Sequence, residues 1–259
     1  MKQWMVLFKK EWLEMTRNYK ILWIPLVFIL LGIMQPVTSY YLPEIIEAAG
    51  NLPEGAVFEV PQPTPEEVLI QTLGQYSQIG VLILVLAFMG IVASEKNSGV
   101  SDIILVKPVS FVNYITAKWV SITVMTVGSF LIGILASWYY TGILIGDVAF
   151  GDFIQGALVY GTWLVFLITV TLLVSTILSS NGFVAFISLL VAIGLSAITS
   201  LLSKWMMWSP ARLSTHAGQL LVTGSPDEHF ALSMSITAVL IIALIGSAVV
   251  LFTKKERAA

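Results

Sequence analysis

The residues whose types and spacing could make specific polar contacts are concentrated in one stretch, residues 95–118. It opens with Glu95, closes with Lys118 and contains three lysines. Long apolar runs bound it on both sides, 79–93 and 119–146, and neither run contains a charged side chain. Such a segment is typical of a loop between two membrane spans, and its lysines predict the cytoplasmic side. The loop is therefore the first candidate for contact with another molecule.

A short apolar segment inside this loop could dock into a shallow groove on a partner. Its members are Val100, Ile103, Ile104 and Leu105. Asp102 and Lys107 flank the segment. Gly99 permits a turn where the preceding helix leaves the bilayer, Pro108 stops the segment, and Ser110 can cap the helix that follows. These residues leave two alternatives open, docking on a partner or lying on lipid as an interfacial helix.

Sequence motifs for enzymatic chemistry are absent. The chain has no GxxxxGKS/T phosphate loop, no HExxH or GxSxG motif, no acidic metal cluster and no Cys. His216 and His229 lie near the C-terminal end, and we expect both to be solvated or interfacial. We therefore predict no catalytic residue, no cofactor site and no metal site in this chain.

The elements that must position the loop are membrane-spanning helices. Of the 259 residues, 57% are hydrophobic and only 11% are charged, whereas a soluble domain carries about 25% charged residues. With a mean hydropathy of +0.90, the chain is predicted to be an all-α polytopic membrane protein with a single domain over 1–259. Six apolar runs are long enough to span, namely 21–42, 76–94, 119–142, 154–178, 183–203 and 231–252.

The distribution of basic residues predicts how these spans are oriented. With the N-terminus inside, eleven of the thirteen Lys and Arg fall in inner segments, and only Lys204 and Arg212 fall in outer ones. The outer loop at 43–75 has six Glu and no Lys or Arg, and the other long outer loop covers 204–230. We therefore predict that both termini are cytoplasmic and that the protein lies in the cell membrane.

Residues 1–20 are predicted to form an amphipathic helix. At 100° per residue, its apolar arc holds Trp4, Met5, Phe8, Trp12 and Met15. Lys10, Glu14 and Arg17 lie roughly opposite this arc. Basic residues together with two Trp favour a helix that lies in the membrane interface. The alternative is a basic flank that only orients the first span.

Capping signatures mark helix starts on the outer side. They are Thr64-Pro65-Glu66-Glu67, Asp152-Phe153-Ile154-Gln155 and Ser225-Pro226-Asp227-Glu228. With Pro65 and Pro226 at the first helical position, the second and sixth spans would continue beyond the bilayer. Gly74 could break the long helix that begins at Pro65. A further short helix is predicted over 211–222, with Gly224 as its stop.

Polar residues near the outer end of the second span have two interpretations. Gln71, Gln75 and Gln78, at i, i+4 and i+7, could line the outer mouth of a pore, or they could form an ordinary polar helix end. All fifteen acids are expected in loops, flanks or helix starts. This placement disfavours ion-coupled transport, because a coupling ion needs a charged partner inside the membrane.

One pattern in the loop carries a resemblance to a known family. It comprises Glu95-Lys96, Gly99, Leu105, Pro108-Val109-Ser110, Tyr114 and Lys118. The pattern resembles the first cytoplasmic loop of ABC-2 type permeases, the membrane subunits of type V (ABCG-like) bacterial ABC transporters. The N-terminal helix, the six spans and the helical element before the last span resemble that family's plan over essentially the whole chain. The resemblance implies that the loop is a coupling helix docking on an ATP-binding subunit through Glu95, Gly99, Ile103, Ile104, Leu105, Pro108, Ser110 and Tyr114.

The resemblance also implies partners and a function. A second permease subunit, identical or related, would complete the translocation path, and ATP and magnesium would bind on the partner ATPase. Dimer contacts would fall partly on the fifth span, where Ala192, Gly194 and Ser196 are small, although lipid-facing positions fit these residues nearly as well. The expected function is export of a hydrophobic or amphipathic substrate such as a lipid, peptide or drug. The alternative is a non-transporting scaffold or sensor that tethers a cytoplasmic regulator.

Overall fold

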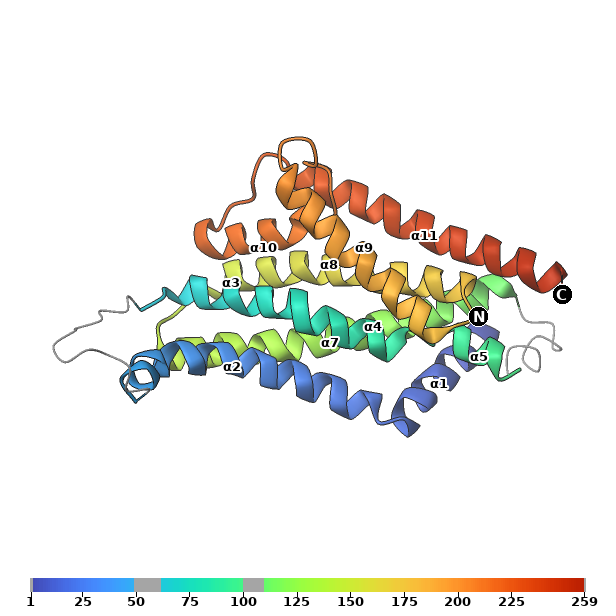
Figure 1. Cartoon of the computed structure of the whole chain (residues 1–259), viewed down its shortest axis with the longest axis horizontal. Coiled ribbons are helices and arrows are strands. Elements are labelled where there is room, and N and C mark those ends of the chain that lie inside the picture. The colour runs from blue at the N-terminus through green and yellow to red at the C-terminus, as the bar shows by residue number, and fades with distance from the viewer. Residues whose placement is uncertain (1, 49–61, 100–109, 259) are drawn as a thin grey trace.

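The computed structural model describes residues 2–48, 62–99 and 110–258, and over these ranges the chain is helical, with no strand (Figure 1). Six helices in these ranges are long and apolar enough to cross a membrane. They are Lys20–Ile45, Pro65–Asn97, Phe111–Leu144, Phe150–Ile177, Asn181–Leu201 and Phe230–Lys255. The predicted all-α architecture with six spans is therefore confirmed.

The spans run along the long axis of the molecule, so the bundle has two ends (Figure 1). One end carries α1 (Lys2–Arg17), α5 (Ala93–Asn97) and the end of α11 (Phe230–Ala258), and we call it the terminal end. The opposite end carries α10 (Arg212–Thr223), and we call it the α10 end. The predicted loop therefore connects helices at the terminal end.

The helices α2 (Lys20–Ala48) and α7 (Phe111–Leu144) approach each other closely because each has a glycine at the contact. A Cβ added to Gly133 would lie 2.5 Å from the backbone oxygen of Phe28, and one added to Gly32 would collide with the backbone oxygen of Gly133. Small residues let helix backbones pack in this way. The α2–α7 pair forms a frame to which α1 is attached, since the indole nitrogen of Trp4 donates to Thr116 Oγ1 at 3.1 Å.

The second span is not one continuous α-helix. It consists of α3 (Pro65–Gln75), the π-helical turn η1 (Tyr76–Gly80), α4 (Val81–Phe88), a turn and α5. The break expected at Gly74 is wrong, because α3 continues through Gly74 and the irregularity begins at Tyr76. A contact with another helix anchors it there, since the Tyr76 hydroxyl donates to the carbonyl of Phe28 at 2.8 Å.

The turn between α4 and α5 is stabilised by a serine from α8 (Phe150–Ile177). Ser175 Oγ accepts hydrogen bonds from the amides of Val92 at 3.1 Å and Ala93 at 3.0 Å, and it donates to the carbonyl of Met89 at 2.9 Å. One hydroxyl thus satisfies backbone groups around the break, where groups left unpaired in the interior would be costly. The turn redirects the chain into α5 and so places Glu95.

One of the three predicted caps is confirmed. The Thr64 side chain accepts from the Glu67 amide at 3.3 Å, and the Glu67 side chain accepts from the Thr64 amide at 2.9 Å, with Pro65 as the first helical residue. Both hydrogen bonds of this capping box join residues three positions apart, so a local sequence pattern was sufficient to predict it.

The other two predicted caps are wrong. The helix α8 begins at Phe150 with Ala149 as its N-cap, which leaves Asp152 inside the first turn, where its charge still suits the helix dipole. The helix α11 begins at Phe230 rather than Pro226. Hydrogen bonds between Thr223 and Ser225 hold that segment in a turn, which competes with a helix start.

The remaining helices agree more closely with expectation. The short helix predicted over 211–222 is confirmed as α10, and Gly224 ends it in the left-handed region with φ +63°. The helix α9 (Asn181–Leu201) starts two residues before the predicted span, directly after a tight turn.

Candidate functional site

The residues that begin and end the predicted docking loop meet in a buried ionic network at the terminal end. The Glu95 carboxylate accepts hydrogen bonds from the Lys10 ammonium, the Tyr114 hydroxyl and, at 2.8 Å, from Lys118 Nζ. Lys118 Nζ also lies 2.8 Å from Glu11. Glu95 is 7% exposed, Glu11 3% and Lys118 1%. Buried charges of this kind persist only when they are paired, and here every one of them is.

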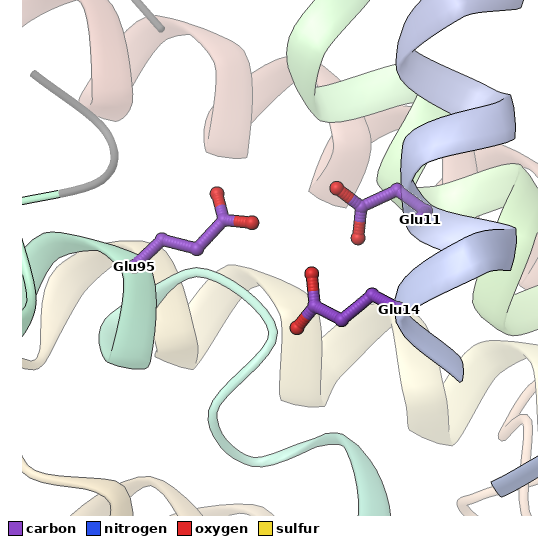
Figure 2. A group of neighbouring side chains, drawn as sticks. All are labelled: Glu11, Glu14 and Glu95. Carbon is purple, nitrogen blue, oxygen red and sulfur yellow. The ribbon is translucent and has the colours of Figure 1, made fainter. Parts of the chain in front are cut away.

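Three carboxylates of this network, those of Glu11, Glu14 and Glu95, converge on one centre, as Figure 2 shows. Their oxygens lie within 4.8 Å of one another, an arrangement that could hold a metal ion. However, Lys10 Nζ lies 3.0 Å from Glu11 and 3.0 Å from Glu14 and also bonds Glu95. With Lys118, two ammonium groups already neutralise most of the charge of three carboxylates. We therefore interpret the group as an ion-pair network.

The pKa of Lys10 is consistent with that interpretation. Burial by itself would lower the pKa of the Lys10 ammonium, but the nearby carboxylates of Glu11 and Glu95 outweigh burial and raise it above its usual range. Lys10 is therefore charged at any pH that the folded protein meets.

Helical spacing explains why these side chains converge. In α1, Lys10, Glu11 and Glu14 lie within one turn, and in α7 Tyr114 and Lys118 are four residues apart and share a face. Lys118 also lies over the Tyr114 ring, 5.0 Å from its centroid. Both faces are directed at α5, which the Ser175-stabilised turn brings between them.

The opposite side of α5 is bound to the carboxyl end of α8. Lys96 Nζ donates to the carbonyl of Thr176 at 2.9 Å, and the Asn97 side chain donates to the carbonyl of Ser179 at 2.6 Å. Cations and donors are favourable at a helix C-terminus, where carbonyl groups lack helical partners. Lys96 also lies 4.7 Å from the ring centroid of Phe252, which stacks on Tyr114 at 5.0 Å. Contacts to α1, α7, α8 and α11 thus hold α5 in place.

The other predicted docking residues fall into two groups. Ile103, Ile104, Leu105 and Pro108 lie outside the described residues. Gly99 adopts φ +70°, which confirms the predicted turn. Ser110 is the N-cap residue of α7, but among the described residues its side chain makes no capping hydrogen bond, so that prediction is wrong. Its backbone carbonyl still accepts from the Tyr114 amide at 3.0 Å.

The N-terminal helix is confirmed as α1, but its predicted buried face is only partly correct. Met15 is buried, as the apolar arc predicts, whereas Met5 is 48% exposed. Glu11 is buried instead, and sequence reasoning missed it. Hydrophobic periodicity treats a carboxylate as solvent-facing, and its partner Lys118 is 107 residues further along the chain. The signal in the sequence for a buried partner of Glu11 was Lys118, which stands at the edge of the long apolar run 119–146.

The three glutamines predicted at a pore mouth have different surroundings. The side-chain oxygen of Gln71 accepts from Gln35 at 2.6 Å, and Gln75 Nε2 lies 3.4 Å from the sulfur of Met34, so both contact α2. Gln78 lines a cavity of about 550 Å³ between the second span, α8 and α9.

The three small residues of α9 also have different surroundings. Ala192 and Ser196 line the same 550 Å³ cavity as Gln78. Ala192 is 5% exposed, so the chain itself covers most of it. Gly194 borders a second cavity of about 360 Å³, formed by α9 side chains. A Cβ added to Gly194 would meet nothing within 4 Å among the described residues, so close packing inside this chain does not require a glycine there.

The expectation that His216 is solvated or interfacial is wrong. It is 1% exposed, because α10 folds back onto α11. Its Nδ1 lies 3.3 Å from Gln219 Oε1 and its Nε2 lies 3.4 Å from Ser233 Oγ. The ring also contacts Phe230 edge-on at 5.8 Å. Burial lowers the pKa of His216.

Comparison with known proteins agrees with the membrane character of the chain. Residues 57–258 match a family described as "Protein of unknown function (DUF2705)". The chain is also 34% identical over 246 residues to "Uncharacterized transmembrane protein YxlG" of Bacillus subtilis (strain 168), covering 94% of this chain and 95% of that protein. Together with the six apolar helices, these matches identify the chain as a transmembrane protein that belongs to the DUF2705 family.

Proposed function

We propose that this chain is a permease subunit of an ATP-driven ABC exporter. In this proposal a second permease subunit, identical or related, completes the translocation path. A separate ATP-binding subunit carries ATP and magnesium and docks on the segment between α5 and α7. The chain itself contributes no catalytic residue.

The observation that carries this proposal is the ionic network at the terminal end. It joins the helix before the docking segment, through Glu95, to the helix after it, through Tyr114 and Lys118. It also joins both of them to Lys10 and Glu11 of α1. A partner that pushes on the segment would therefore move α1, α5 and α7 together, which is what mechanical coupling requires. Glu95 and Tyr114 are buried, so in this proposal they hold the docking segment in place and do not touch the ATPase.

The charge distribution supports a cytoplasmic location for the terminal end. Basic residues gather on α1, at the start of α2, on α5, at the start of α7 and at the end of α11. All of these elements lie at the terminal end (Figure 1). Lys204 lies in the segment that leads into α10, and Arg212 is the first residue of α10. By the positive-inside rule, both termini face the cytoplasm of a bacterial cell and the α10 end faces outward.

The cavity beside the second span supports a route for an uncharged or weakly polar substrate. Its 550 Å³ are within the range of sites that hold drug-sized ligands. Trp163, Leu167 and Leu189 supply apolar surface, whereas Ser77, Gln78 and Ser196 supply hydrogen-bonding groups. Among the described residues that line this cavity, none is charged. A lipid, an amphipathic peptide or a drug fits this surface.

Co-purification tests the proposal. The intact protein and the variant I103D/I104D are purified in mild detergent, and the proteins that come with them are identified by mass spectrometry. We expect an ATP-binding subunit with the intact protein and its loss from the variant, because two acids would disrupt an apolar docking segment. A matched control is L201D/L202D, which places the same two charges at the last residue of α9 and at its C-cap, away from the terminal end.

The alternative function gives a different result. A scaffold or sensor would retain a cytoplasmic regulator through the same segment and would bring down no ATPase in any nucleotide state. That outcome, with the protein folded and the control variant unaffected, would overturn the exporter proposal.

A further inference from the structure

Two cavities meet at the π-helical turn of the second span. The 550 Å³ cavity lies between this span, α8 and α9, and a cavity of about 520 Å³ lies between α3 and α10. Ser77, the second residue of η1, lines both of them. The turn therefore lies between the two cavities, and Ser77 contributes to the wall of each.

A tyrosine from α8 holds Ser77 in this position. The Ser77 hydroxyl donates to the carbonyl of Leu73 at 3.0 Å and lies 2.8 Å from the Tyr160 hydroxyl. A serine hydroxyl has one proton, so with that proton on Leu73 the Tyr160 hydroxyl is the donor to Ser77. Tyr160 is fully buried, and its ring packs 5.1 Å from that of Phe130. The Tyr160 hydroxyl therefore has a fixed position, and its hydrogen bond to Ser77 holds the π-helical turn.

The second span is held at both ends and also at Tyr76, the first residue of η1, whose buried hydroxyl donates to the carbonyl of Phe28 at 2.8 Å. Thr72 in α3 is buried and lies 2.9 Å from Ser137 of α7, hydroxyl to hydroxyl. Glu95 in α5 is held by the ionic network. Between these ends, Gln78 and Ile79 are exposed, and Gln78 faces the larger cavity.

The geometry of a π turn permits movement of the middle alone. Such a turn contains one residue more than the α-helical turn it replaces, and it occurs mostly as a single turn inside an α-helix. If the π turn moves along the helix, the flanking segments α3 and α5 keep their positions in the bundle. Each residue that it passes rotates by about 100°, the angle per residue of an α-helix.

We propose that η1 is a movable joint of the second span and that Tyr160 is the positioning residue that holds it. In the held state, Ser77 and Gln78 face the cavities. When the joint moves, Ser77 leaves Tyr160, Gln78 rotates out of the larger cavity, and the wall that separates the two cavities changes. The consequence for transport rests on the function proposed above, but the movement of the joint does not.

Cysteine labelling tests the joint, because the chain has no cysteine of its own. The variant Gln78→Cys is placed in lipid nanodiscs, and its rate of reaction with N-ethylmaleimide is measured with and without Tyr160→Phe. Loss of one partly buried hydrogen bond that favours the held state should change the rate by about fivefold. Ser77→Ala, which removes the same bond from the other side, should reproduce the change, and Ser77→Thr, which keeps a hydroxyl, should not.

The matched control is Gln71→Cys, which lies in α3 outside the joint. Its labelling rate should be unaffected by Tyr160→Phe, because α3 stays in place. An unchanged rate at Gln78→Cys, or an equal change at Gln71→Cys, would overturn the proposal. No ATPase or substrate takes part in this experiment. A negative result would therefore count against the joint alone, and the co-purification experiment remains a separate test of the exporter.

Discussion

Replacement of Lys118 by Met tests how strongly the ionic network holds the terminal end together. The substitution keeps most of the side-chain length but removes an ammonium group that lies 2.8 Å from both Glu11 and Glu95. Lys118 is 1% exposed, so little water can replace the lost charge. Three carboxylates would then share one remaining cationic partner in the network, Lys10.

The cost follows from the separation of those carboxylates. Their oxygens lie within 4.8 Å of one another. With an effective dielectric constant of about 20, two unit charges at this distance repel by roughly 3 kcal/mol. Removing one partner from a buried ion pair costs about 3–5 kcal/mol in other proteins, so the two values agree. At about 2–4 °C per kcal/mol, Lys118→Met should lower the unfolding midpoint by roughly 10 °C.

Thermal unfolding in detergent, followed by tryptophan fluorescence, measures this shift, since the chain has eight Trp. The double variant Glu11→Gln/Lys118→Met removes one charge of each sign and should recover at least half of the loss. Glu14→Gln serves as the control, because the Glu14 side chain is 47% exposed and its loss should cost less than about 1 kcal/mol. A Lys118→Met protein as stable as the unmodified one, or a double variant less stable than both single variants, would refute the reasoning.

Three further predictions concern packing, backbone satisfaction and pH. Gly133→Ala should destabilise the protein by about 1–3 kcal/mol in the same unfolding assay, because its Cβ would lie 2.5 Å from a backbone oxygen of α2. Gly128→Ala, whose Cβ would meet nothing within 4 Å among the described residues, should not. Ser175→Ala should cost about 2 kcal/mol or more, because two buried amides lose their acceptor. The control Ser188→Ala should cost little, since that hydroxyl has no partner among the described residues. Burial lowers the pKa of His216 from its ordinary 6.5, so its stabilising effect is complete above pH 6.5 and is lost as the pH falls. His216→Asn should therefore flatten the decline in the unfolding midpoint as the pH falls below about 6.5, and an unchanged slope would contradict this assignment.

The features that sequence alone predicted are those that depend on local pattern. The six spans follow from the length of apolar runs, and the Thr64 capping box follows from hydrogen bonds between residues three apart. The end of α10 at Gly224 follows from the conformational freedom of glycine. In each case the physical cause lies within a few residues of its effect.

The features that sequence did not predict depend on partners far along the chain. Burial of Glu11 requires Lys118, which is 107 residues away. The break after α4 requires Ser175, 83 residues beyond Val92. The π turn that begins at Tyr76 contains no proline that would indicate it in the sequence. It is anchored by the carbonyl of Phe28 on α2 and the hydroxyl of Tyr160 on α8. Such pairings appear only once the helices are packed.

The residues of the candidate site show the same difference between what a local pattern predicts and what distant partners determine. Gly99 could be singled out as a turn residue, and Glu95 and Tyr114 by the resemblance that their stretch carries, but the burial of Glu95 and Tyr114 could not be predicted. Lys10 is expected opposite the apolar arc of the N-terminal helix, yet it lies at the centre of the network. Hydrophobic periodicity cannot distinguish a solvated charge from one that is buried and neutralised by a partner.

The ionic network also constrains the order in which the protein can be assembled during synthesis. Lys10, Glu11 and Glu14 leave the ribosome first, and Glu95 follows, but Lys118 comes from the start of the third span. Until that span has been made, Glu11 and Glu95 have only Lys10 as a shared partner, so neither can be buried with its charge fully balanced. The N-terminal helix must therefore remain at the membrane surface through the insertion of two spans. Arrival of the third of the six spans then fixes α1, α5 and α7 in a single step of biogenesis.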